Sequence, residues 1–121
     1  MNKVNPFLYQ NIDNSNHWII SEIILNQCKQ HPNNKIIQFV DGPEWSFDDL
    51  KNIAFEKAKT LRDLSINQGD TVTVMVDDPV DFIPYWVASS FLGVMFVALN
   101  TALKGSVLLH QIRLANSNVI I

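Results

Sequence analysis

Residues 67–121 alternate between two hydrophobic periods, and this alternation constrains the fold more than any other feature of the chain. β-Branched or apolar runs predict strands, and apolar residues three and four apart predict helices, in the order strand, helix, strand, helix, strand. This order predicts an α/β fold whose βαβαβ unit forms a parallel sheet with right-handed crossovers. The sequence stops on the apolar triplet Val119-Ile120-Ile121, whereas chain ends are usually polar. We therefore expect a partial, N-terminal piece of an α/β domain, truncated at the C-terminus.

The strands of this unit are predicted at residues 71–76, at residues 94–99 and from Val119 onward. The first strand is rich in β-branched residues, which favour strands. The second is continuously apolar, which is typical of a parallel strand that is buried on both faces. The last helix is predicted to open at Gly105, and its inner face is expected to hold Val107, Leu108, Ile112 and Ala115.

The helix between the first two strands is apolar nearly all round, so it is predicted to be buried. Asp78 or Asp81 is expected to cap its N-terminus. We favour Asp81, because Pro84 then falls in the first turn, where its missing N–H does no harm. Gly93 is expected to end this helix.

The region before residue 67 predicts two helices and a β-hairpin. The first helix covers residues 18–28, and the hairpin joins strands at residues 36–40 and 45–47. Ser46 and Asp49 have the spacing of a capping box, which predicts the start of the second helix. Apolar residues repeat at helical intervals from there until residue 64.

Composition and charge exclude several classes of function. The net charge is −3 and the nine basic residues are scattered, so no nucleic acid partner is expected. Residues 1–16 are polar and asparagine-rich and lack the order of a signal peptide, so we expect a flexible leader before a domain at residues 17–121. The single cysteine, Cys28, excludes a disulfide within the chain and favours a reducing, cytoplasmic location.

Residues 82–99 form a run of 18 uncharged residues, which is the lower edge of a membrane-spanning length. Pro84 and Gly93 interrupt this run, and three aspartates crowd one of its flanks. A buried helix followed by a buried strand uses the same residues without strain. We therefore expect no membrane span. A small single-span membrane protein is an alternative, and membrane association of another kind is compatible with the sequence.

Residues that usually carry chemistry are sparse. The four glycines stand alone, so neither a dinucleotide fingerprint nor a Walker loop can be drawn. His17, His31 and His110 lie far apart without the spacing of metal ligands, so surface or loop positions are expected for them. Cys28 is expected to be a small core residue, because nothing near it in the sequence would lower its pKa. The tryptophans are also expected in the core: Trp18, Trp45 and Trp86.

Two polar groups follow the ends of predicted strands. Asp77, Asp78 and Asp81 could hold a metal ion or act as acid and base. Helix capping and the helix dipole require acids at the same place, so we interpret these aspartates as structural. Asn100 and Thr101 follow the next strand, on the edge where open α/β sheets bind ligands. We interpret this pair as a structural turn.

Four short segments succeed one another with well-fitting gaps: DGPEWSFDDL at residues 41–50, QGDTV at 68–72, Asp81-Phe82 with Leu92-Gly93-Val94, and LNTALKG at 99–105. This series resembles the N-terminal motifs of ATP-dependent acyl-CoA synthetases in the adenylate-forming, AMP-binding superfamily. The last segment is similar to a run in fatty-acyl and carnitine-type CoA ligases. The resemblance covers about residues 39–121. Ser65 departs from the family pattern, because it stands where a glycine usually ends the helix, and a less well capped helix end is expected.

The resemblance implies a ligase that works in two steps. A carboxylate, with a fatty acid as the favoured class, attacks the α-phosphate of ATP to give an acyl-adenylate and pyrophosphate, and coenzyme A then displaces AMP. ATP, magnesium and coenzyme A are thus implied for the full-length family. The catalytic motifs of the family match no residue of this chain, so we assign no catalytic, cofactor-binding or metal residue. The chain alone is expected to be inactive and poorly soluble or partly molten. A non-catalytic remnant or interaction module is the alternative.

Overall fold

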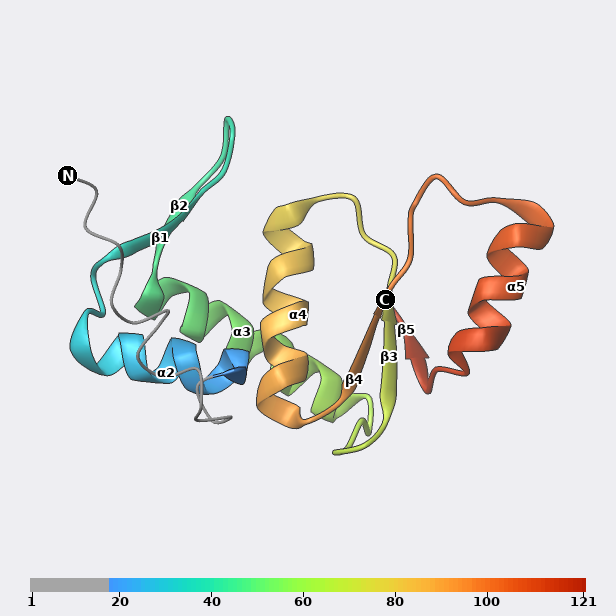
Figure 1. The fold of residues 1–121 in the computed structure, drawn as a ribbon, viewed down its shortest axis with the longest axis horizontal. Helices are drawn as coiled ribbons and strands as arrows, with labels where there is room; N and C mark the ends of the chain where they lie inside the picture. Colours follow the sequence, from blue (N-terminus) through green and yellow to red (C-terminus); the bar gives the residue numbers. More distant parts are fainter. Residues whose placement is uncertain (1–17) are drawn as a thin grey trace.

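The computed structural model describes residues 18–121, so the predicted leader and His17 lie outside the described residues. The described part has the order of helices and strands that the sequence predicts (Figure 1). Its N-terminal half contains α2 (Ile20–Gln30), β1 (Lys35–Gln38), β2 (Glu44–Ser46) and α3 (Phe47–Asp63). Its C-terminal half contains β3 (Thr71–Val74), α4 (Pro79–Leu92), β4 (Met95–Ala98), α5 (Gly105–Ala115) and β5 (Val119–Ile120).

β3 is the central strand of a three-stranded parallel sheet with the order β4-β3-β5. Val72 of β3 pairs with Phe96 of β4 and with Val119 of β5. The pairing continues past the end of β5, because the N–H of Met75 donates to the carbonyl of Ile121 over 2.9 Å. α4 lies on one side of the sheet and α5 on the other (Figure 1). The predicted α/β class and its parallel βαβαβ unit are therefore confirmed.

β1 and β2 form the predicted antiparallel hairpin, which leads directly into α3. Ser46 caps this helix, because its hydroxyl accepts from the N–H of Asp49 over 3.2 Å. The N–H of Ser46 in turn donates to the carboxylate of Asp49 over 2.9 Å, which completes the predicted capping box. This backbone hydrogen bond, together with one from the Ser46 hydroxyl, holds the pKa of Asp49 below its ordinary value, since both stabilise the ionised carboxylate.

Ser65 closes the C-terminus of α3 with a left-handed backbone conformation, at a φ of 64°. Its N–H donates to the carbonyl of Arg62 over 2.8 Å. The N–H of Ile66 donates to the carbonyl of Leu61 over 3.0 Å, and the two bonds together form a Schellman motif. The prediction of a less well capped helix end is therefore wrong, because both hydrogen bonds of the motif are formed. The cost of lacking glycine lies in the left-handed backbone, which is unfavourable for a residue with a β-carbon.

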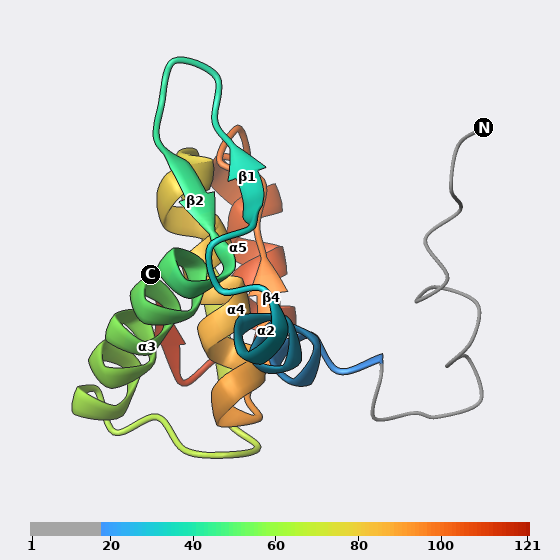
Figure 2. The ribbon, with the colours of Figure 1, turned by 90° about the vertical axis from the view of Figure 1, so that its left-hand side faces the viewer.

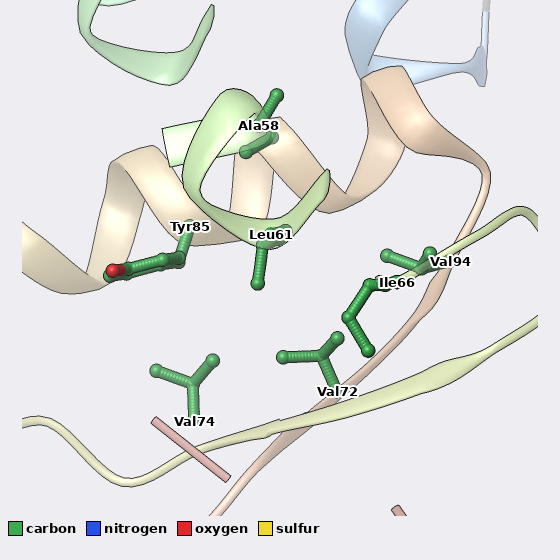
Figure 3. Close-up of a cluster of buried hydrophobic side chains, with 8 residues drawn as sticks. Ala58, Leu61, Ile66, Val72, Val74, Tyr85 and Val94 are labelled. Atoms are coloured by element: carbon green, nitrogen blue, oxygen red, sulfur yellow. The ribbon is translucent and has the colours of Figure 1, made fainter. Parts of the chain in front are cut away.

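The main hydrophobic core lies between β3 and the two helices that cover one face of the sheet (Figure 3). Val72 and Val74 of β3 point toward Leu61 of α3, and all three side chains are fully buried. Burying an apolar side chain of this size contributes about 1.5–3 kcal/mol. The buried members of this core are Ala58, Leu61, Ile66, Val72, Val74, Tyr85, Ala88 and Val94.

A second hydrophobic cluster joins the hairpin to α2, α3 and α4 (Figure 2). Phe39 and Trp45 pack edge to face in it, with ring centroids 4.6 Å apart. Val87 of α4 belongs to this second cluster, whereas Tyr85 and Ala88 of the same helix belong to the main core. α4 therefore packs against the sheet and against the N-terminal half at once.

The N-terminus of α4 differs from the expectation. Asp78 is the N-cap, and its Oδ1 accepts from the N–H of Val80 over 2.9 Å. Pro79 takes the first helical turn, where a missing N–H costs nothing. Pro84 lies inside the helix and is fully buried. The prediction of Asp81 as the cap is wrong, because Pro79 already supplies the proline that begins the helix.

Several side chains that were expected to be buried are exposed. β4 is an edge strand of the described sheet, and Met95 is 59% exposed, so its predicted burial on both faces is wrong. α5 has no fully buried residue, and Val107, predicted on its inner face, is exposed. Trp18 and Trp86 are exposed too, whereas Trp45 is buried as predicted. Periodicity identifies an apolar face but not the element that covers it.

The apolar run at residues 82–99 is divided between α4 and β4. Gly93 separates them with a left-handed φ of 65°, and it ends α4 as the sequence predicts. Within residues 18–121, no helix is both long enough and apolar enough to cross a membrane.

Replacing Leu61 by alanine should lower the free energy of unfolding by about 2–5 kcal/mol, because the substitution leaves a cavity in the main core. Leu64→Ala is the matched control at the end of the same helix, where the side chain is 48% exposed. That variant should lose less than about 1 kcal/mol. Urea unfolding of the protein measures both changes, and equal losses would contradict the packing of Leu61.

Replacing Ser65 by glycine should raise the free energy of unfolding by about 0.5–1 kcal/mol. Glycine removes the cost of a β-carbon in the left-handed region, about 1–2 kcal/mol, and part of this gain is offset by the greater freedom of glycine in the unfolded chain. Ser65→Ala keeps the β-carbon and should bring no gain. A urea midpoint that is unchanged in the glycine variant would refute this explanation.

Candidate functional site

The carboxyl edge of the parallel sheet is the candidate site. It comprises the residues that follow β3 and β4, namely Asp77, Asp78, Asn100 and Thr101, together with Ile121 after β5. The loop from β3 leads to α4 on one side of the sheet, and the loop from the adjacent β4 leads to α5 on the other (Figure 1). Open α/β sheets bind ligands outside the carboxyl ends of their strands, and the switch point of this sheet, where the strand order reverses, lies between β3 and β5.

A hydrogen bond between side chains joins the two diverging loops. The hydroxyl of Thr101 in the β4–α5 loop donates to Oδ1 of Asp77 in the β3–α4 loop. Both backbones are also held to the sheet below, because the N–H of Leu99 donates to the carbonyl of Val74 over 3.0 Å. The sequence predicts both side chains on this edge but does not predict that they bind each other. The available signal is their position in the sequence. Asp77 lies three residues after Val74, Thr101 lies three residues after Ala98, and these two strand residues pair in the sheet.

The three aspartates near α4 have three different partners. Asp78 caps the helix, as described above, and Asp77 binds Thr101. Asp81 forms an ion pair with Lys57 of α3 over 3.2 Å, and this pair links the two helices. The ammonium of Lys57 also lies 4.9 Å from the ring centroid of Tyr85. The structural interpretation of these aspartates is therefore supported. Among residues 18–121, no group of three His, Cys, Asp or Glu side chains could hold a metal ion.

Asn100 forms a local turn at the start of the β4–α5 loop. Its side-chain Oδ1 accepts from the N–H of Ala102 over 2.9 Å, and its carbonyl accepts from the N–H of Leu103 over 3.1 Å. An asparagine that binds the backbone two residues ahead is typical of an Asx turn. The prediction of a structural turn at this position is confirmed.

A cavity of about 460 Å³ lies beside the carboxyl edge, between β4 and α5. Its floor includes Leu99, and α5 contributes the polar side chains of His110 and Gln111 along with Leu114. This cavity is not predicted from the sequence. The spacing of residues 110, 111 and 114 places them on one helical face, but the sequence does not reveal that this face overlies the end of β4.

The remaining predicted positions lie away from the carboxyl edge. Cys28 is half-buried, and its thiol donates to the carbonyl of Phe47 over 3.2 Å. Burial raises the pKa of the Cys28 thiol, and this effect exceeds the opposing charge of Lys51. His31 ends α2 and His110 lies on α5, and both are exposed as predicted. The structure does not bring Cys28, His31 and His110 together. The candidate site therefore consists of the loops at the carboxyl edge and the polar contacts that hold them.

Comparison with known proteins identifies the family. The model of the family described as AMP-binding enzyme matches residues 24–121. A curated relative, 2-succinylbenzoate–CoA ligase from Oceanobacillus iheyensis, is 30% identical over 105 residues, which are 87% of this chain and 21% of the relative. The chain thus spans about a fifth of the length of that relative.

Solved structures show the same fold. VinN in complex with 3-methylaspartate matches with a TM-score of 0.78 and 20% identity, over 84% of this chain and 28% of that one. O-succinylbenzoate coenzyme A synthetase (MenE) from Bacillus subtilis matches with a TM-score of 0.74 and 23% identity, over 80% of this chain and 21% of that one. With a family match that covers most of its length, the chain belongs to the AMP-binding enzyme family, as its ordered motifs predict.

Proposed function

We propose that these residues form the first part of the AMP-binding domain of an acyl-CoA synthetase. The enzyme would activate a small carboxylic acid with ATP and transfer the acyl group to coenzyme A. The observation that carries the proposal is the 30% identity to a CoA ligase across 87% of the chain. Because the chain spans about a fifth of that relative, we assign the reaction to a polypeptide that contains these residues rather than to residues 1–121 alone.

Two classes of carboxylic acid are candidates for the substrate. The motif at residues 99–105 is similar to that of fatty-acyl and carnitine-type ligases and favours a fatty acid. The curated relative is named for 2-succinylbenzoate, which favours a different acid. A panel that contains both classes distinguishes them in the experiment below.

ATP, Mg²⁺ and coenzyme A are part of this proposal, but the described residues do not by themselves fit these groups. Asp77, Asp78 and Asp81 are occupied by a loop contact, a helix cap and an ion pair. The glycines stand singly, so they form no backbone cradle for phosphates. In the proposal, the described residues build the sheet and hold the two loops that follow β3 and β4.

The longest natural polypeptide that contains these residues should catalyse exchange of pyrophosphate into ATP in the presence of a suitable acid. Residues 1–121 alone should show no exchange above background, because they contain no phosphate-binding loop. The assay compares both chains with fatty acids of several lengths and with 2-succinylbenzoate. Pyrophosphate exchange by the 121-residue chain would contradict the proposal that the reaction needs a longer polypeptide. Absence of exchange in both chains with every acid would favour a non-catalytic interaction module.

Replacing Thr101 by valine should loosen the two loops of the carboxyl edge, because valine has a similar shape but cannot donate to Asp77. A hydrogen bond of this kind contributes about 0.5–1.5 kcal/mol, so amide exchange in both loops should accelerate about 2- to 10-fold. Thr101→Ser retains the hydroxyl and should exchange like the parent. Exchange that is unchanged in the valine variant would show that this bond does not hold the loops.

A further inference from the structure

An apolar groove lies among α2, β1, α3 and α4. It encloses about 330 Å³, and its lining is almost entirely aliphatic and aromatic. Ile20 and Ile24 of α2, Ile36 of β1, and Ile83 and Trp86 of α4 form its walls. We call this feature the isoleucine groove.

Large apolar side chains at the groove are only partly covered. Trp86 is 43% exposed and Ile36 is 39% exposed, although both line the groove. Trp18 and Ile19, which directly precede the groove residue Ile20, are exposed as well. Exposed apolar surface is unfavourable by roughly 25 cal/mol per Å², and a concave apolar patch of this kind usually marks a binding surface.

We propose that the groove is occupied by the apolar run Phe7-Leu8-Tyr9 of the same chain. These are the only three consecutive apolar side chains among residues 1–17, which otherwise contain five asparagines. Aromatic and leucine side chains suit an aliphatic groove that offers almost no polar partner. The remaining leader residues are polar and are not part of the proposed contact.

The connection to Ile20 makes this occupant favourable. Tyr9 lies eleven positions before Ile20 in the chain, which allows a reach of up to about 36 Å. The helix α2 that lines the groove has 11 residues and is about 16 Å long. The segment can therefore reach every part of the groove, and its attachment keeps its effective concentration near the millimolar range. A second copy of the chain has no such advantage.

Disulfide trapping tests the proposal in the full chain, with Cys28→Ser as the background. The test pair is Leu8→Cys with Ile36→Cys, which places one thiol on the segment and one in the groove. The matched control pair is Leu8→Cys with Lys35→Cys. Lys35 is adjacent in β1 and equally close along the chain, but its side chain pairs with Glu44 across the hairpin and does not line the groove.

Docking predicts that the Ile36 pair forms an intramolecular disulfide at least about tenfold faster than the Lys35 pair. Adding Phe7→Ser and Tyr9→Ser should abolish this difference, because the segment then loses its apolar side chains. Equal rates in the two parent pairs would overturn the proposal. Disulfides that join two chains would also overturn it, in favour of a second copy as the occupant.

A second measurement avoids new cysteines. In a Trp18→Phe background, the accessible tryptophan should be Trp86, because Trp45 is buried. Combining Phe7→Ser with Leu8→Ser should make Trp86 more accessible to acrylamide quenching, whereas Asn11→Ser in the same segment should not. Quenching that is the same in all three chains would refute occupation of the groove.

Discussion

The rest of the structure depends on the packing of α4, which is buried on two sides by two different groups of side chains. Tyr85 and Ala88 of this helix join the main core against β3, while Val87 joins the cluster under the hairpin. An amphipathic helix has one apolar stripe, whereas α4 is apolar nearly all round, as a helix between two cores must be. Ala58 and Leu61 of α3 also belong to the main core, so α3 and α4 together join the N-terminal half to the sheet.

The position of α4 also sets the geometry of the carboxyl edge. Because α4 covers one face of the sheet and α5 covers the other, the loops after β3 and β4 leave the sheet in opposite directions. The contact of Asp77 with Thr101 bridges the loops where they separate. The polar residues of this edge thus stabilise the arrangement of the two loops.

The two faces of the sheet are stabilised unequally. The face toward α3 and α4 contains the main core, whereas α5 on the other face has no fully buried residue. Contact with that second face includes a hydrogen bond between the hydroxyls of Thr73 and Ser117. Polar contacts of this kind contribute less than burial of large apolar side chains. We therefore expect the α5 side to open more readily than the main core within the described residues.

The sequence by itself determined the order of elements, the class of the sheet and most helix ends, because these depend on local patterns. The capping box of Ser46 with Asp49, the stop at Gly93 and the turn at Asn100 each involve residues within four positions of one another. Only the tertiary structure decided which apolar faces are covered and which polar groups meet. Met95, Trp86 and Val107 are exposed although each belongs to an apolar pattern. Asp77 accepts a hydrogen bond from Thr101, which lies 24 positions further along the chain. Burial and long-range pairing depend on which elements become neighbours, and periodicity along the chain does not predict which elements these are.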